Sequence, residues 1–288
     1  MISPRRIPLT LAAAQFPVTG DMRRNARWIR RQIESAAARG VDAILFPETA
    51  LSGYAGVDFP SFDDFDWDTH REEFDAIRSA TREHSIWVLV GSAHFVADGI
   101  APTNAVYVID PRGQIRTRYD KSMLYRKETE HFSPGNSLVT FRIGSTVCGV
   151  LICFDSCFPD LYAELEERRV RILFHAYSNA GNRGPTSVDE ILIAQARARA
   201  YDASYFIVGS NSSRKHSAAA SFIAGPDGRF SSLSRHKPGI VVETIAADDP
   251  FWGFRRSGSP SIRGAHRALK DAPNHPRIEN RKSAPSDD

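Results

Sequence analysis

The sequence predicts an α/β fold in which two β-sheets pack face to face between outer helices, a four-layer α-β-β-α sandwich. Three observations predict it. Amphipathic helical patterns alternate with short apolar strands in the first part of the chain, as in β-α-β units. Isolated apolar strands, such as ILF (44–46) and FIV (206–208), need cover on both faces. The chain is 42% hydrophobic and 25% charged, which suits a globular domain with a sizeable core.

The chain is predicted to open with a β-α-β unit. Residues 8–18 form the first strand and residues 21–40 the first helix, with Asp21 as its N-cap and Gly40 as its C-terminal stop. Apolar side chains recur in this helix at helical spacing, namely Met22, Ala26, Ile29, Ile33, Ala36 and Ala37. The strand over 41–47 follows at once, so the helix serves as a crossover between two neighbouring strands.

The same order repeats before two hairpins begin. A helix over 69–84 and a strand over 86–96 complete the second repeat. Residues 104–121 and 138–153 each contain two alternating runs around a turn, Asp-Pro-Arg-Gly in the first and Gly-Ser in the second. Each segment therefore predicts a β-hairpin.

The rest of the chain predicts a second series of strands and helices. In order these are a helix from Pro159, a strand over 170–178, a helix over 186–203, a strand over 205–211, a hairpin turning at 225–228, and a strand over 239–247. Together the elements predict one domain over residues 1–257. Residues 258–288 hold too few apolar side chains for a core of their own, so this tail is expected to be loose or packed at a subunit interface.

Charge and cysteine content exclude several classes of protein. The net charge is only +3, and the arginines near the N-terminus lack interleaved aromatic residues, so no nucleic-acid partner is expected. No stretch of about eighteen uncharged apolar residues is present, and the first residues lack the apolar core of a signal peptide, which predicts a cytoplasmic protein without a membrane partner. Cys148, Cys153 and Cys157 are odd in number and lack a nearby histidine pair, which favours a reducing compartment and no metal site.

Cys153 is the first candidate for chemistry. It stands where the apolar run of STVCGVLIC (145–153) stops and shortly before the helix from Pro159, and α/β sheets bind ligands at such strand ends. If the thiol faced the start of that helix, the helix dipole would favour the thiolate. The alternative interpretation is a small buried hydrophobic residue.

Two further residues follow apolar strands. Thiol chemistry on a carbonyl needs a base and a group that stabilises the oxyanion, and no histidine lies in an evident motif. Glu48 follows the strand ending in Phe46-Pro47, where burial would raise its pKa toward that of a general base. Lys121 closes an alternating strand and offers a compact positive charge. Read singly, each is also compatible with a solvated side chain at a strand end.

Taken together, three stretches resemble the nitrilase superfamily of carbon–nitrogen hydrolases. FPE with a following Gly-Tyr (46–54), YDKSML (119–124) and GVLICFDSCFP (149–159) match that family's motifs in order and at similar separations. Weaker matches at 198–211 and 221–228 extend the resemblance over most of the chain. The resemblance implies the same α-β-β-α sandwich and a homo-oligomer, a dimer or larger.

The resemblance also implies an active site of Glu48, Lys121 and Cys153. Glu128 occupies the position of the family's second glutamate, which would hold Lys121 and the substrate in place, and Glu130 is the alternative.

The implied reaction runs through a thioester. Glu48 takes the proton of Cys153, the sulfur attacks a carbonyl carbon, and Lys121 with the backbone N–H of Phe154 holds the oxyanion. Ammonia or an amine leaves, and water then hydrolyses the thioester. No cofactor or metal is required.

The substrate expectation rests on departures from the family pattern. Relatives that hydrolyse nitriles carry Trp-Glu after the cysteine, whereas this chain has Phe154-Asp155, which favours a small linear amide or an N-carbamoyl amine. Candidate substrate-binding residues are Tyr54, His175, Tyr177 and Asn179, although the loop holding the last three could equally only cap the sheet. Two alternatives to the hydrolase stay open, an acyl transferase that uses the same thioester and a catalytically silent binding or scaffold protein.

Overall fold

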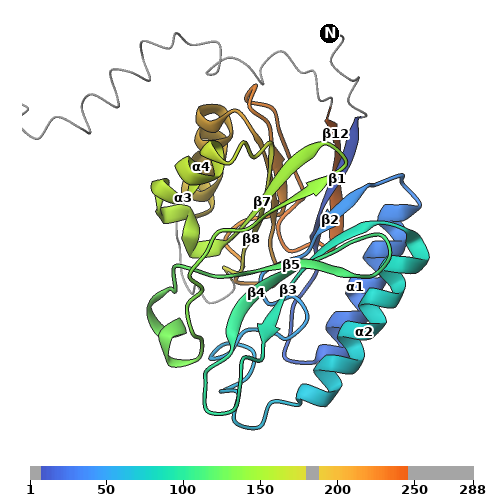
Figure 1. Cartoon of the computed structure of the whole chain (residues 1–288), viewed down its shortest axis with the longest axis vertical. Coiled ribbons are helices and arrows are strands. Elements are labelled where there is room, and N and C mark those ends of the chain that lie inside the picture. Colours follow the sequence, from blue (N-terminus) through green and yellow to red (C-terminus); the bar gives the residue numbers. More distant parts are fainter. Residues whose placement is uncertain (1–7, 180–187, 246–288) are drawn as a thin grey trace, which may run out of the picture.

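The computed structural model describes residues 8–179 and 188–245 and confirms the predicted sandwich (Figure 1). Within these residues the first six-stranded sheet runs in the order β12 (Gly239–Ile245), β1 (Leu9–Gln15), β2 (Ala43–Leu45), β3 (Trp87–His94), β4 (Thr103–Ile109) and β5 (Ile115–Asp120). The second runs in the order β11 (Phe230–Ser232), β10 (Phe222–Ala224), β9 (Phe206–Ser210), β8 (Ile172–Ala176), β7 (Thr146–Ile152) and β6 (Thr140–Ile143).

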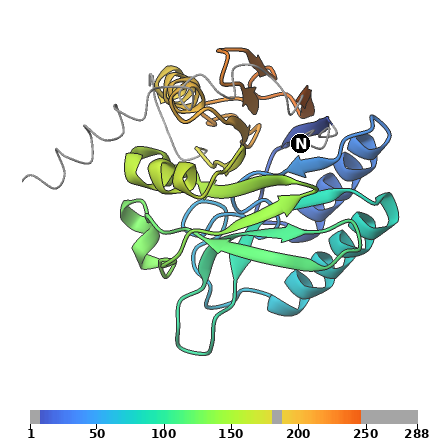
Figure 2. The same ribbon diagram turned by 45° about the horizontal axis from the view of Figure 1, so that its top comes forward.

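Helices cover the outer faces of both sheets. The helices α1 (Met22–Ala37) and α2 (Trp67–His84) lie side by side outside the first sheet, and α3 (Pro159–Glu167) and α4 (Val188–Ala203) lie outside the second (Figures 1 and 2). Asp21 caps α1 as predicted, because its side chain accepts a hydrogen bond from the Arg24 N–H at 2.9 Å. The helix ends at Ala37, before Gly40, which adopts a left-handed φ of 68° in the loop beyond.

The core explains why the central strands read as apolar without alternation. In the first sheet, Leu11, Leu45 and Leu89 belong to the cluster between the two sheets. Their strand neighbours Ile44 and Val88 belong to a second cluster that packs beneath α1 and α2. Because successive side chains point to opposite faces, both faces of these strands are buried.

Parallel pairing places several strand ends together. The strands β1, β2 and β3 pair in parallel in the first sheet, as do β7, β8 and β9 in the second. The carboxyl ends of parallel strands lie at one edge of a sheet, where α/β proteins commonly bind ligands. The chemistry-bearing residues that follow β2 and β7 therefore share one end of the sandwich.

Two short helical turns were not anticipated. A 3₁₀ turn, η1 (Arg126–Glu130), follows β5, and a second, η2 (Cys153–Cys157), separates β7 from α3. Such turns are set by a few local hydrogen bonds and have no apolar periodicity by which to recognise them. Cys153 consequently lies at the start of η2 and not directly at the start of the longer helix.

Some sequence expectations fall outside the described residues. These are positions 186–187 of the predicted fourth helix, the end of the last predicted strand, and the tail over 258–288. Among the residues that are described, no helix has the length and apolarity that crossing a membrane requires. The same residues contain no group of three or more histidine, cysteine, aspartate or glutamate side chains that could hold a metal ion.

Candidate active site

Glu48, Lys121 and Cys153 are brought together from three separate strand ends. Glu48 follows β2, Lys121 follows β5 and Cys153 follows β7. The Lys121 Nζ lies 2.8 Å from Glu48 Oε1 and 2.8 Å from Glu128 Oε2. All three of these charged side chains are almost completely buried. The charges of Glu48 and Lys121 both act on the pKa of the Cys153 thiol, so the sulfur lies within electrostatic range of the ion cluster.

The backbone around Glu48 is held by close contacts with both sheets. Its N–H donates to the carbonyl of Tyr177, beyond the end of β8, at 3.2 Å. On the other side, β3 approaches so closely that a Cβ at Gly91 would lie 2.1 Å from the carbonyl oxygen of Pro47 and 2.7 Å from the N of Thr49. Only glycine allows this approach. Glu48 is therefore fixed between the first sheet and the strand that neighbours the cysteine.

Cys153 has a strained backbone. Its φ is 41°, in the left-handed region, which costs a non-glycine residue roughly 1–2 kcal/mol. The Sγ lies 3.9 Å from the carbonyl oxygen of Ser178 and 3.9 Å from Nδ2 of Asn179. Strain of this kind concentrates at functional sites, where the surrounding structure holds it.

Burial and neighbouring charges together determine the pKa values of Glu48 and Lys121. Burial raises the pKa of Glu48 to about 7, and the attraction and hydrogen bond of Lys121 lower that pKa only in part. Burial alone would lower the pKa of Lys121, but the negative charges of Glu48 and Glu128 raise it above its ordinary value. Lys121 therefore stays an ammonium ion at neutral pH, while Glu48 exchanges a proton near pH 7.

The thiol is protonated in the resting site. Burial, and then the charge of Glu48, raise the pKa of Cys153 well above its usual range, against the opposing effect of Lys121. The expectation that the helix after Cys153 favours the thiolate therefore does not hold, because η2 intervenes and burial dominates. A base must remove this proton before the sulfur can act as a nucleophile.

Asn104 is a site residue that the sequence analysis missed. Its Nδ2 donates to Glu48 Oε1 at 2.7 Å and to Glu128 Oε1 at 3.1 Å, and its backbone carbonyl accepts from the backbone N–H of Lys121 at 2.8 Å. Because Asn104 and Lys121 both bind Oε1, the second oxygen of Glu48, Oε2, is left without a partner among the described residues. The signal in the sequence was an amide side chain within a mostly apolar strand, TNAVYVI, all of which is buried in the structure. A buried amide needs hydrogen-bond partners.

Replacing Asn104 with alanine is expected to reduce both stability and activity. Two buried carboxylates lose a donor, which lowers the free energy of unfolding by about 1–3 kcal/mol. The displaced Glu48 lowers kcat/KM by up to about 10²-fold. Urea denaturation and amide turnover measure the two effects.

Gln32→Ala provides a matched control for Asn104→Ala. Gln32 is a buried amide whose Nε2 donates to the carbonyls of Gln15 and Gly239 at 2.9 and 3.1 Å, away from the site. Its removal is expected to lower stability comparably while leaving kcat/KM unchanged. Equal losses of activity in both variants would contradict a specific effect of Asn104 on Glu48.

The structure places the two candidate second glutamates differently. Glu128 is buried in η1, accepts from Lys121 Nζ, and also accepts from the Tyr125 N–H at 2.5 Å. Glu130 is exposed to solvent. Glu128 and not Glu130 therefore contacts the lysine.

Phe154, whose N–H was expected to bind the oxyanion, follows Cys153 in η2, and its ring packs on Tyr125 with ring centroids 5.2 Å apart.

The four candidate substrate-binding residues separate into two pairs. Tyr54 lies close enough to Glu48, Glu128 and Cys153 that their charges, after burial, raise its pKa. Asn179 reaches toward the sulfur, and its Oδ1 accepts from Asn211 Nδ2 at 2.7 Å, which fixes the side chain. Both are therefore placed to contact a molecule bound at the thiol.

His175 and Tyr177 are positioned differently. The His175 ring is fully buried and stacks on Tyr177 with centroids 4.2 Å apart. Its Nδ1 lies 3.3 Å from the hydroxyl of Tyr162 in α3, and burial lowers its pKa to about 3, so it is neutral. His175 and Tyr177 thus pack against α3, while a backbone hydrogen bond with Cys153 also acts on His175 and the Tyr177 carbonyl accepts from the Glu48 N–H. Their contact with a substrate stays a prediction.

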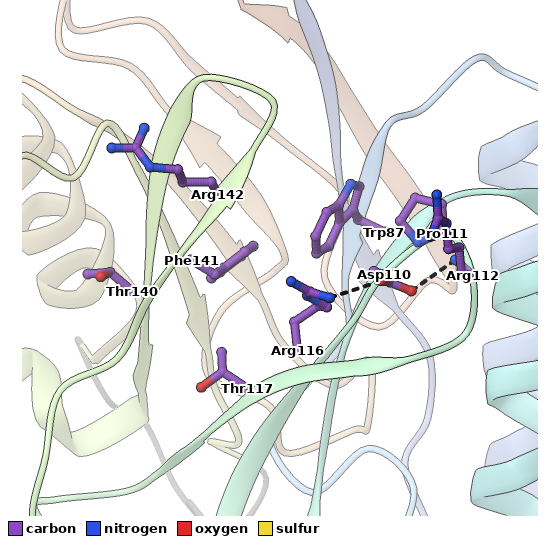
Figure 3. Close-up of a pocket in the computed structure, with 9 residues that line it drawn as sticks. All are labelled: Trp87, Asp110, Pro111, Arg112, Arg116, Thr117, Thr140, Phe141 and Arg142. Atoms are coloured by element: carbon purple, nitrogen blue, oxygen red, sulfur yellow. Dashed lines mark hydrogen bonds and ion pairs between the residues drawn. The ribbon is translucent and has the colours of Figure 1, made fainter.

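A cavity of about 550 Å³ lies elsewhere on the sandwich (Figure 3). It is lined by Trp87, Asp110, Pro111, Arg112, Arg116, Thr117, Thr140, Phe141 and Arg142. These residues come from the starts of β3 and β5, the turn before β5, and β6, so the cavity shares no residue with the ion cluster. In the close-up the guanidinium of Arg142 points away from that of Arg116, and the charges do not converge on one ligand position (Figure 3).

Comparisons with known proteins agree with the geometry. A family model described as carbon-nitrogen hydrolase matches residues 10–249. The chain is 22% identical to the nitrilase and fragile histidine triad fusion protein NitFhit of Caenorhabditis elegans, over 86% of this chain and 60% of that protein. It is 23% identical to the chloroplastic omega-amidase of Arabidopsis thaliana, over 83% of this chain and 68% of the relative.

A solved structure with the same fold is a variant of the amidase from Nesterenkonia sp. AN1. It superposes with a TM-score of 0.73 at 21% identity, over 89% of this chain and 97% of the other. That structure is described as showing covalent addition of the acetamide moiety of fluoroacetamide at the active-site cysteine.

Proposed function

Because the chain belongs to the carbon–nitrogen hydrolase family, we propose that it cleaves the non-peptide C–N bond of a small linear amide or N-carbamoyl amine through a thioester on Cys153. One observation carries this proposal. The buried carboxylate of Glu48, whose pKa is raised to about 7, lies 2.8 Å from the Lys121 ammonium and acts electrostatically on the protonated thiol of Cys153. This set supplies the base, the nucleophile and the positive charge that acyl transfer to sulfur requires.

In the proposed acylation step, Oε2 of Glu48 accepts the proton of the Cys153 thiol. The sulfur forms a bond to the carbonyl carbon, and the electron pair of the C=O bond moves to oxygen. The ammonium of Lys121 and the backbone N–H of Phe154 stabilise this oxyanion. When the C–N bond breaks, Glu48 returns its proton to the leaving nitrogen, and ammonia or an amine departs.

In the proposed deacylation step, water replaces the amine. Glu48 removes a proton from the water, and the resulting hydroxide attacks the thioester carbon. The C–S bond then breaks to release the acid, and Glu48 returns its proton to the leaving sulfur, which regenerates the thiol. Glu128 keeps Lys121 charged and in place throughout, while Tyr54 and Asn179 contact the substrate. Because Glu48 accepts and returns each proton, the proposed steps require no cofactor or metal.

The amide substrate class has its own support. The Arabidopsis relative is named an omega-amidase, and the superposed Nesterenkonia protein is named an amidase. Phe154-Asp155 follows the cysteine in place of the Trp-Glu pair of relatives that act on nitriles. We also propose that the protein is cytoplasmic, which the three free cysteines support. The family resemblance supports a homo-oligomer, with a catalytic domain over residues 1–257.

The proposal is tested by incubating the protein with a panel of linear amides, N-carbamoyl amino acids and nitriles. We expect ammonia or amine release from amides or carbamoyl compounds, with a transient acyl adduct on Cys153 detected by intact-mass spectrometry and peptide mapping. Adding amine acceptors separates transfer from hydrolysis. A panel that produces neither released nitrogen nor adduct would contradict the proposed hydrolase and favour a binding protein.

A further inference from the structure

Asp155 is a fully buried carboxylate two residues beyond Cys153. Its Oδ2 accepts hydrogen bonds from the Ile152 N–H at 2.9 Å and from the Tyr119 hydroxyl at 2.8 Å. Its Oδ1 accepts from the Met123 N–H at 3.0 Å. Neither Glu48 nor Asn104 contributes to these bonds, so they form a second polar cluster beside the ion cluster.

The three donors come from the two segments that carry the nucleophile and the lysine. Ile152 is the last residue of β7 and directly precedes Cys153 in the second sheet. Tyr119 and Met123 stand two residues before and two residues after Lys121, at the end of β5 in the first sheet. A single carboxylate therefore links the end of β7, which precedes Cys153, to the segment of the first sheet that carries Lys121.

The bond to Ile152 also acts on the strained turn. Cys153 has a φ of 41°, and such a conformation persists only where surrounding contacts hold it. The Ile152 N–H and the Asp155 carboxylate stand on either side of Cys153 and close the turn across it. Loss of this bond would allow the turn to relax and move the sulfur.

We propose that Asp155 is a positioning residue that sets the placement of Cys153 relative to Lys121. It contacts neither the substrate nor the reacting atoms and acts through Ile152 and the segment around Lys121. The inference rests on the proposed function for the roles of the thiol and the ammonium. It identifies Asp155 as the residue that fixes the position of these two groups relative to each other.

The chemistry of the cluster requires a carboxylate at this position. All three partners are donors, and an ionised carboxylate offers acceptors on both oxygens. An asparagine of the same shape would turn its NH₂ group toward at least one of these donors and lose that bond. Burial raises the pKa of Asp155 to about 6, against the lowering effect of the three hydrogen bonds, so the carboxylate is ionised at neutral pH.

The test uses Asp155→Asn, with Tyr119→Phe as a milder variant that removes one of the three donors. The matched control is Asp160→Asn, which removes an exposed carboxylate in the first turn of α3. Each variant is assayed for kcat and KM on an amide that the wild-type protein hydrolyses. The rate of Cys153 alkylation by iodoacetamide, followed by peptide mass, is measured alongside circular dichroism and Tm.

For Asp155→Asn we expect kcat to fall by about 10²-fold with little change in KM, because misplacement of reacting groups acts on the transition state. Cys153 alkylation should slow in the same variant. Tyr119→Phe should show smaller losses in both readouts, and Asp160→Asn should match the wild type.

Two outcomes would overturn the proposal. The first is a folded Asp155→Asn protein whose kcat and alkylation rate equal those of Asp160→Asn. The second applies if Asp155→Asn does not fold: Tyr119→Phe then has the kcat and alkylation rate of the wild-type protein. Alkylation needs no amide turnover, so it tests the positioning of Cys153 even if the proposed hydrolase activity fails.

Discussion

Replacing Cys153 with alanine is expected to abolish amide hydrolysis, with kcat/KM falling by at least about 10⁴-fold, since removing a nucleophile leaves only binding and oxyanion stabilisation. The same change removes the acyl adduct in intact-mass spectra. Substrate binding should persist, because the Glu48, Lys121 and Glu128 cluster does not include the sulfur. Ammonia release, intact mass and isothermal titration calorimetry measure these three effects.

Cys157→Ser is the matched control for this experiment. Cys157 is an exposed thiol in the same 3₁₀ turn, whereas Cys148 is buried in the core. The Cys157→Ser variant should retain wild-type turnover and the adduct. If the adduct formed on Cys157, or if Cys153→Ala kept its turnover, another residue would be the nucleophile and the assignment of Cys153 would be wrong.

Replacing Glu48 with glutamine is expected to lower kcat/KM by about 10²–10⁴-fold, the range that a positioned general base contributes. Glutamine keeps the shape of the side chain and an oxygen for Lys121 but cannot accept the thiol proton. Glu130→Gln, which alters an exposed glutamate near the site, should leave activity unchanged and serves as the control. Steady-state kinetics on the best amide substrate measures both variants.

The pH profile distinguishes loss of the base from misfolding. Burial raises the pKa of Glu48 to about 7, and the base must be ionised to accept a proton. The wild-type kcat/KM should therefore fall about tenfold per pH unit below pH 7 and level off above it. The residual activity of Glu48→Gln should lack this acidic limb. An unchanged limb in that variant would show that another group titrates near pH 7.

Most of the fold could be predicted because its signals are local. The apolar spacing of α1 and the N-cap at Asp21 lie within a few residues, and both were found in the structure. Element ends were less accurate. The first strand was predicted to reach residue 18 but ends at Gln15, and α1 ends before Gly40. Strand ends depend on where the partner strand stops, which local sequence does not specify.

Parts of the candidate site could not be predicted because they depend on contacts across the sandwich. Asn104 reaches Glu48, 56 positions away in the chain. Tyr119 reaches Asp155, 36 positions away. Neither pair has a spacing typical of a helix face or a turn, so no periodicity in the sequence relates them. The left-handed conformation of Cys153 likewise requires the surrounding hydrogen bonds to hold it.

By itself, the sequence determined the order of strands and helices, the sandwich that this order implies, and the placement of an acid, a lysine and a cysteine after three separate strands. The tertiary structure decided which oxygen of Glu48 stays free, that Glu128 and not Glu130 contacts the lysine, and that the resting thiol is protonated. The physical reason is that apolar periodicity and capping act over a few residues. Burial and charge act through distances between side chains that only the folded chain defines.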